Sequence, residues 1–79
     1  TYARLQHDLA KAYSKNEDIG SAIKHDLLAI DYVGDNKELQ FLTHNSLGGY
    51  FLDNDNLVES ISEFKKALDI AIEMDDQMR

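Results

Sequence analysis

Three histidines and one acidic segment are the parts of this chain that come closest to a site for chemistry. The histidines are His7, His25 and His44, and no two of them lie three or four residues apart. Two imidazoles need that spacing to meet on one face of a helix, so the chain offers no helical pair of zinc ligands. We interpret all three as helix-surface or partly buried side chains.

The acidic segment with Asp53, Asp55 and Asn56 has the residue types of a calcium loop but not its pattern. Such a loop needs glycine at its sixth position and glutamate at its twelfth, where this chain has Val58 and Phe64. The chain also has no cysteine, no serine in a nucleophile elbow and no glycine-rich phosphate loop. These patterns predict no catalytic residues, no metal and no cofactor, so we expect a protein that is not an enzyme.

The composition disfavours two further classes of partner. The net charge is −7 over 79 residues, and an acidic surface repels both the phosphate backbone of nucleic acids and anionic membranes. No apolar run approaches the ~20 residues of a membrane span. We therefore expect no nucleic-acid or membrane partner and favour a cytoplasmic location. The chain opens on Thr1 rather than Met, which suggests a piece of a longer protein.

Apolar residues at helical spacing predict four helices, and no segment shows the alternation of a strand. The first is expected over about 2–14, with Asn16 in the left-handed conformation that ends a helix. The second should end at Gly34, and Asp35 or Asn36 should cap the third. Asn56 should cap the last. The short breaks predict an all-α chain of two antiparallel helix-turn-helix hairpins.

We expect the large apolar side chains of each helix to form its buried face. They are Tyr2, Leu5, Leu9, Ala12 and Tyr13 on the first helix, Ile19, Ala22, Ile23, Leu27, Ile30 and Val33 on the second, Leu39, Leu42, Leu47, Tyr50 and Phe51 on the third, and Leu57, Ile61, Phe64, Leu68 and Ile72 on the last.

The segment 9–23 recurs as 47–61, at a constant offset of 38 residues. Small residues fall at matching positions, which suggests that helices approach closely there, with bulky residues interlocking beside them. The positions expected to pack within the repeats are Leu9, Ala10, Tyr13, Ala22 and Ala29 in the first copy, and Leu47, Gly48, Phe51, Ser60, Phe64 and Ala67 in the second.

This series resembles the tetratricopeptide repeat family, whose signature is large–small–aromatic on one helix and Ala–aromatic–Ala on the next. Asp26 stands where the family has the second aromatic residue, and we expect its neighbour Leu27 to do that packing. Gln6 and His44 stand at the position usually held by Trp. The offset grows from 38 to 40 toward the end, as in the longer repeats of bacterial signalling proteins. The resemblance implies one repeat domain over 1–79, with repeats over about 1–35 and 36–79, forming a fragment of a right-handed α–α superhelix.

The resemblance also implies a protein-interaction module with a concave groove built from the first helix of each repeat. The residues expected to meet a peptide there are Arg4, His7, Lys11 and Asn45. An alternative is a peptide-sensing region that controls an attached kinase, diguanylate cyclase, phosphatase or DNA-binding domain. A further expectation is self-association through the C-terminal helix, because no polar capping helix covers it.

Overall fold

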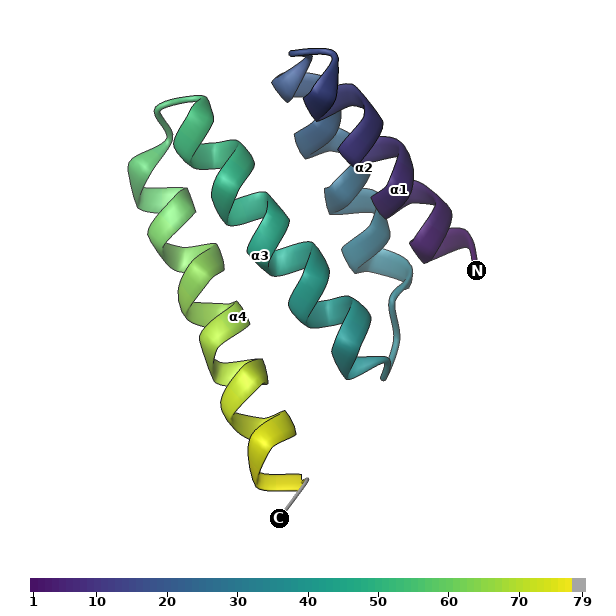
Figure 1. Ribbon diagram of the computed structural model, residues 1–79, viewed down its shortest axis with the longest axis vertical. Helices are drawn as coiled ribbons and strands as arrows, with labels where there is room; N and C mark the ends of the chain where they lie inside the picture. The colour runs from purple at the N-terminus through teal and green to yellow at the C-terminus, as the bar shows by residue number, and fades with distance from the viewer. Residues whose placement is uncertain (78–79) are drawn as a thin grey trace.

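The computed structural model describes residues 1–77, which form four α-helices (Figure 1). They are α1 (Tyr2–Lys15), α2 (Ile19–Tyr32), α3 (Lys37–Asp53) and α4 (Leu57–Gln77), and no strand occurs among the described residues. The prediction of an all-α chain is confirmed. Within the same residues, no helix combines the length and the apolar character needed to cross a membrane.

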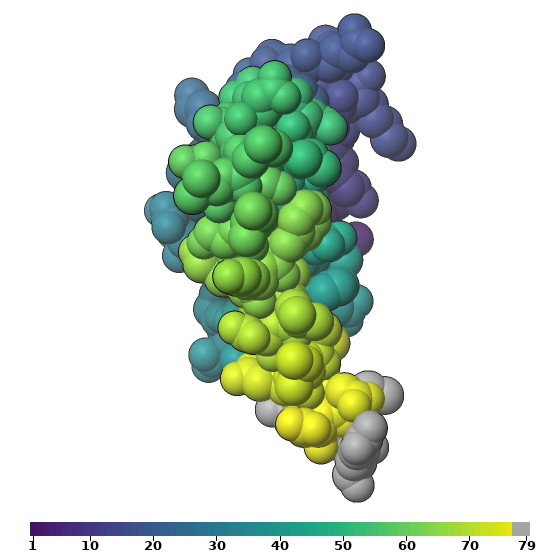
Figure 2. Space-filling model, turned by 90° about the vertical axis from the view of Figure 1, so that its left-hand side faces the viewer, coloured from purple at the N-terminus to yellow at the C-terminus, as the bar shows by residue number. Residues whose placement is uncertain are grey.

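The helices pack in chain order and alternate in direction (Figure 1). α1 packs on α2, and α3 packs on α4, while α2 and α3 join the two pairs. α1 meets α3 only over a small area. α4 therefore forms one outer face of the molecule, along which it runs from top to bottom in Figure 2.

The turns inside the two helix pairs have the same conformation, 38 residues apart. Glu17 has φ 62° in the first turn and Asp55 has φ 60° in the second. The same backbone hydrogen bond closes each turn, from Asp18 N to Tyr13 O at 2.9 Å and from Asn56 N to Phe51 O at 2.8 Å. The prediction that Asn16 takes the left-handed conformation is wrong, because its φ is −87° and the following residue carries the positive φ instead. A bond of this type satisfies a carbonyl that the last helical turn leaves open.

The connection between the pairs follows its sequence signals. α2 ends at Tyr32, and Gly34 has φ 60°, a conformation that residues with a Cβ adopt less easily. Asn36 caps α3, since its side-chain oxygen accepts a hydrogen bond from Leu39 N at 3.0 Å. The cap satisfies one of the N–H groups that the first turn of a helix leaves unpaired.

Small and polar side chains, more than large apolar ones, fill the contacts between the helices. The residues buried are Ala3, His7 and Ala10 in α1, Ala22, Asp26 and Ala29 in α2, Leu39, Thr43, Leu47, Gly48 and Tyr50 in α3, and Ser60, Glu63 and Ala67 in α4. The expected buried faces of the first and last helices are therefore wrong, as is the expectation that Leu27 packs in place of an aromatic residue. Large apolar residues left exposed are Tyr2, Leu5, Leu9, Leu27, Tyr32, Leu52, Leu57, Val58, Ile61, Phe64, Leu68 and Ile72. Periodicity identifies an apolar stripe on a helix, but it does not say whether the chain itself supplies a surface to cover that stripe.

The second helix pair shows why a small residue is needed at the closest approach. A Cβ added at Gly48 would lie 2.6 Å from the ring of Phe64. Ser60, at the matching position on α4, donates from Oγ to Gly48 O at 2.8 Å. In the first pair Ala10 takes the place of Gly48 and the smaller Asp26 takes the place of Phe64, so a methyl group fits.

Candidate functional site

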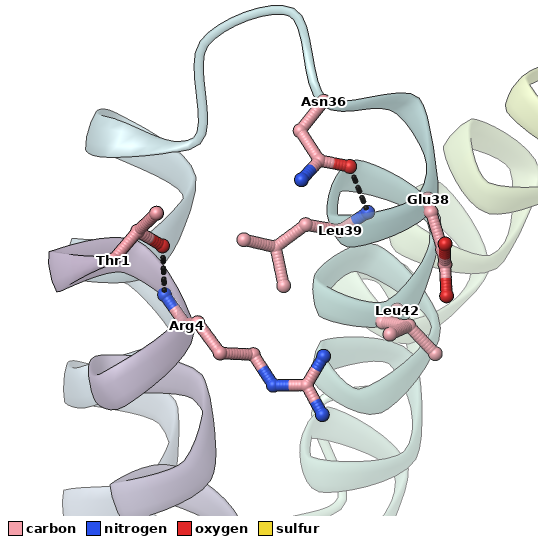
Figure 3. A pocket seen from close by; sticks show the side chains of 6 residues that line it. All are labelled: Thr1, Arg4, Asn36, Glu38, Leu39 and Leu42. Atoms are coloured by element: carbon pink, nitrogen blue, oxygen red, sulfur yellow. Dashed lines mark hydrogen bonds between the residues drawn. The ribbon is translucent and has the colours of Figure 1, made fainter.

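A pocket of about 260 Å³ opens between the N-terminal turns of α1 and α3 (Figure 3). Its lining residues are Thr1, Arg4, Asn36, Glu38, Leu39 and Leu42. The two helix caps lie at this pocket: Thr1 Oγ1 accepts from Arg4 N at 3.1 Å, and Asn36 caps α3. The positive ends of two helix dipoles therefore lie at the pocket wall, where a negative group is favoured.

Arg4 is the basic side chain of the pocket. Its Nε lies 3.3 Å from Asp8 Oδ1, one helical turn along α1. Figure 3 shows the two terminal amino groups of the guanidinium directed across the pocket toward α3. Within residues 1–77 these two groups have no hydrogen-bond partner. They are therefore free to donate to a carboxylate or carbonyl group placed between the helices.

The four residues expected in the groove occupy different places. Of the four, Arg4 lines the pocket. Lys11 is exposed farther along α1, with Nζ 3.8 Å from Asp8 Oδ1, and Asn45 is exposed on α3. His7 is only 3% exposed, so it is not the surface or partly buried side chain that the sequence suggested.

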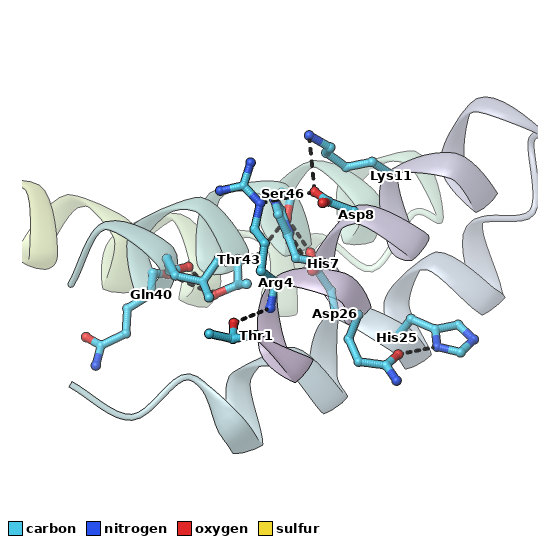
Figure 4. Close-up of polar contacts among 12 residues, drawn as sticks. Thr1, Arg4, His7, Asp8, Lys11, His25, Asp26, Gln40, Thr43 and Ser46 are labelled. Carbon is cyan, nitrogen blue, oxygen red and sulfur yellow. Dashed lines mark hydrogen bonds and ion pairs between the residues drawn. The ribbon is translucent and has the colours of Figure 1, made fainter. Parts of the chain in front are cut away.

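His7 belongs to a buried polar cluster that joins three helices (Figure 4). Its Nδ1 lies 2.8 Å from Oδ1 of Asp26 on α2, and the Asp26 side chain is fully buried. Ser46 on α3 donates from Oγ to the other carboxylate oxygen of Asp26. Asp26 thus links both helix pairs, and every buried side-chain nitrogen or oxygen among the described residues has a partner.

The order of this cluster decides what chemistry it could support. A nucleophilic serine needs an imidazole next to its hydroxyl, with a carboxylate behind the imidazole. Here the carboxylate of Asp26 lies between Ser46 and His7, and all three groups are in the interior or at its edge. This geometry fits a link between helices and does not fit that triad.

Tyr50 lies beside the cluster, and the charge of Asp26 affects the pKa of its phenol. Burial raises the pKa of its phenol above the usual 10.0, and the nearby carboxylate of Asp26 raises the pKa further. A hydrogen bond with Ser46 acts in the opposite direction. The phenol packs in the core with Ala10 and Ala22, so α3 contributes both a polar and an apolar contact to this junction.

One more polar contact joins the two helices within each helix pair. Gln6 Oε1 lies 2.7 Å from His25 Nδ1, and His44 Nδ1 lies 2.8 Å from Glu63 Oε1. The ring of His25 also stacks on Tyr13, with centroids 5.2 Å apart. At the offset of 38 residues, Gln6 corresponds to His44 and His25 to Glu63, so one polar contact recurs in both pairs with its residue types changed.

Sequence reasoning missed these contacts because it searched for histidine partners within one helix. All three pairs, including His7 with Asp26, are separated by 19 residues. In an antiparallel helix pair the separation of facing residues falls toward the turn, so an equal separation means that the three contacts lie at nearly the same level of their helix pairs. The sequence predicts such partners only once the hairpin is assumed. Within residues 1–77 no three His, Cys, Asp or Glu side chains gather as a group that could hold a metal.

Comparisons with known proteins found no match for this chain. No family model matches the sequence, and neither a curated protein nor a solved structure matches it.

Proposed function

We propose that this chain is a pair of tetratricopeptide-like repeats that serves as a protein-interaction module, part of a larger bacterial regulatory protein. Its support is internal. The turns, the polar contacts and the small packing positions recur at one offset, and each helix pair would be one unit of a right-handed superhelix. The module would act by binding a peptide or protein rather than by catalysis.

The observation that carries the binding proposal is the Arg4 guanidinium, whose terminal amino groups face the pocket between α1 and α3 (Figure 3). Leu39 and Leu42 supply an apolar wall opposite it. An extended peptide could place a carboxylate on Arg4 and an apolar side chain against the leucines. Lys11 extends the positive charge along α1, which matters in a molecule whose net charge is −7.

The test is the affinity for peptides that carry either a free or an amidated C-terminus, measured by fluorescence polarisation. Arg4→Ala should weaken the best free-acid peptide by roughly tenfold, the value of one charge-assisted hydrogen bond. Lys24→Ala is the matched control, because it removes the same charge from an exposed position on α2. Unchanged affinity in both Arg4→Ala and Lys11→Ala would remove the proposal.

A second candidate is a peptide-sensing region that controls an attached effector. The supporting observation is that the pocket takes its lining from both helix pairs, α1 on one side and α3 on the other. A ligand that touches both sides would favour one relative orientation of the pairs. Amide hydrogen exchange in α2 and α3 with and without bound peptide would distinguish this candidate, since a passive adaptor needs no change at that junction.

A further inference from the structure

The outer face of α4 carries a row of exposed apolar side chains. They are Leu57, Ile61, Phe64, Leu68 and Ile72, all at helical spacing on one side of the helix. In Figure 2 this helix runs along the surface nearest the viewer, with no other helix in front of it. Contiguous exposed apolar surface of this kind is typical of an interaction site.

The outer face of α1 carries a second apolar patch. Leu5 is 69% exposed and Leu9 is 41% exposed. At the offset of 38 they correspond to Thr43 and Leu47 on α3, which are both fully buried. The same position on a helix is therefore covered on α3 and left open on α1.

The junction between α2 and α3 shows what a cover for these two faces looks like. Ile19 and Ile23 of α2 are half-buried and pack against the core cluster of Ala10, Ala22 and Tyr50, to which α3 contributes Tyr50. On α4 the corresponding residues are Leu57 and Ile61. The exposed face of α4 therefore corresponds to the face of α2 that packs on α3. The exposed face of α1 corresponds to the face of α3 that packs on α2.

One small and one large side chain meet at the α2–α3 junction, and the faces of α4 and α1 carry a large and a small side chain at the corresponding positions. At the α2–α3 junction a small Asp26 on α2 is accompanied by a large Tyr50 on α3. At the corresponding positions α4 has the large Phe64 and α1 has the small Ala12. The ring of Phe64 already lies over Gly48, as Tyr50 packs with Ala10. A helix that docks on α4 must therefore be small at this point, as α1 is.

We infer that α4 of one copy of this chain docks on α1 of a second copy, head to tail, in the way that α2 docks on α3. The occupant that we infer for the α4 face is therefore the α1 face of a second copy, so the contact joins two different surfaces. Such a contact leaves one α1 face and one α4 face open in every assembly that does not close into a ring. This inference does not depend on peptide binding in the pocket between α1 and α3.

Sedimentation of the 79-residue chain over a wide range of concentration tests the contact. The average mass should rise beyond that of a dimer as concentration rises, because each copy carries both faces. Ile61→Glu and Leu5→Glu should each weaken association by at least about tenfold, since each places an unpaired charge in the contact. Both positions are exposed in the single chain, so circular dichroism should show the helices intact.

Val58→Glu is the matched control on α4. Val58 is 77% exposed, and it corresponds to Gly20 of α2. Gly20 stays exposed although α2 packs on α3, so we expect Val58 to lie outside the contact between copies. This variant should associate like the unaltered chain. Leu68→Glu and Leu9→Glu serve as second variants for the two faces.

Mixing the two blocked variants separates a head-to-tail contact from a symmetric one. Leu5→Glu keeps its α4 face and Ile61→Glu keeps its α1 face, so an equimolar mixture should form a dimer and nothing larger. A chain that stays monomeric at every concentration would overturn the inference. So would a Leu5→Glu variant that still associates by itself, or a mixture that stays monomeric.

Discussion

His7 Nδ1 lies 2.8 Å from Asp26 Oδ1, and the two side chains are almost completely removed from solvent. The pair spans α1 and α2, and Ser46 reaches the same carboxylate from α3. One carboxylate therefore holds three helices in register. A buried polar group is tolerated only while its partners remain, so this link should be sensitive to loss of any member.

Asp26→Ala should destabilise the chain by about 1–3 kcal/mol for each buried partner it leaves unpaired. Asp26→Asn should be less damaging, because an amide can both donate and accept. Chemical denaturation provides the measurement. The control is Asp31→Ala on the same helix, since Asp31 is exposed and makes no ion pair within residues 1–77. Equal stability of the two alanine variants would show that the buried link contributes nothing.

The two adjacent glycines of α3 should respond in opposite directions to a methyl group. Gly48→Ala gains about 1 kcal/mol of helix propensity, but its Cβ would lie 2.6 Å from the Phe64 ring, and overpacking costs about 1–3 kcal/mol. Gly49→Ala meets nothing within 4 Å and should gain the propensity alone. Thermal unfolding of both variants tests this. Adding Phe64→Leu to Gly48→Ala should recover stability, and a Gly48→Ala protein as stable as Gly49→Ala contradicts the packing account.

Tyr50 should make stability depend on pH in the alkaline range. Its pKa in the folded chain is raised above 10.0 by burial and by Asp26, so above that pH the unfolded chain loses the phenolic proton first. The contribution of Tyr50 is fully present below pH 10 and is lost as the pH rises through the folded pKa. Tyr50→Phe should remove this part of the slope, at most roughly 1.4 kcal/mol per pH unit. Denaturation of both proteins between pH 8 and 11 gives the difference, in which the other tyrosines and the lysines cancel; identical slopes would contradict it.

The sequence alone predicts the four helices, but it does not predict the side-chain contacts that join them. Gly34 and Asn36 act through local backbone chemistry, and a single segment of sequence contains all the information that a turn or cap requires. His7 and Asp26 act across helices, and an aspartate at a position expected to be aromatic gives no sign of its partner until a fold is assumed. The spacing of the apolar row on α4 predicts a buried face, but the row is exposed, because spacing does not identify what covers a helix.

The polar contact between the helices of each pair provides a test of the repeat itself. If Gln6–His25 and His44–Glu63 are equivalent, the second pair should accept the residues of the first. Glu63→His alone places two imidazoles face to face and also removes the carboxylate that holds Lys66 at 3.0 Å, so it should be destabilising. His44→Gln combined with Glu63→His rebuilds the 2.7 Å contact seen in the first pair and should recover part of the loss. The double variant should therefore be less destabilised than the sum of the two single variants, by a coupling energy of about 0.5–3 kcal/mol in the double-mutant cycle. Strict additivity would show that the two positions are not equivalent, and that the offset of 38 describes sequence without describing contacts.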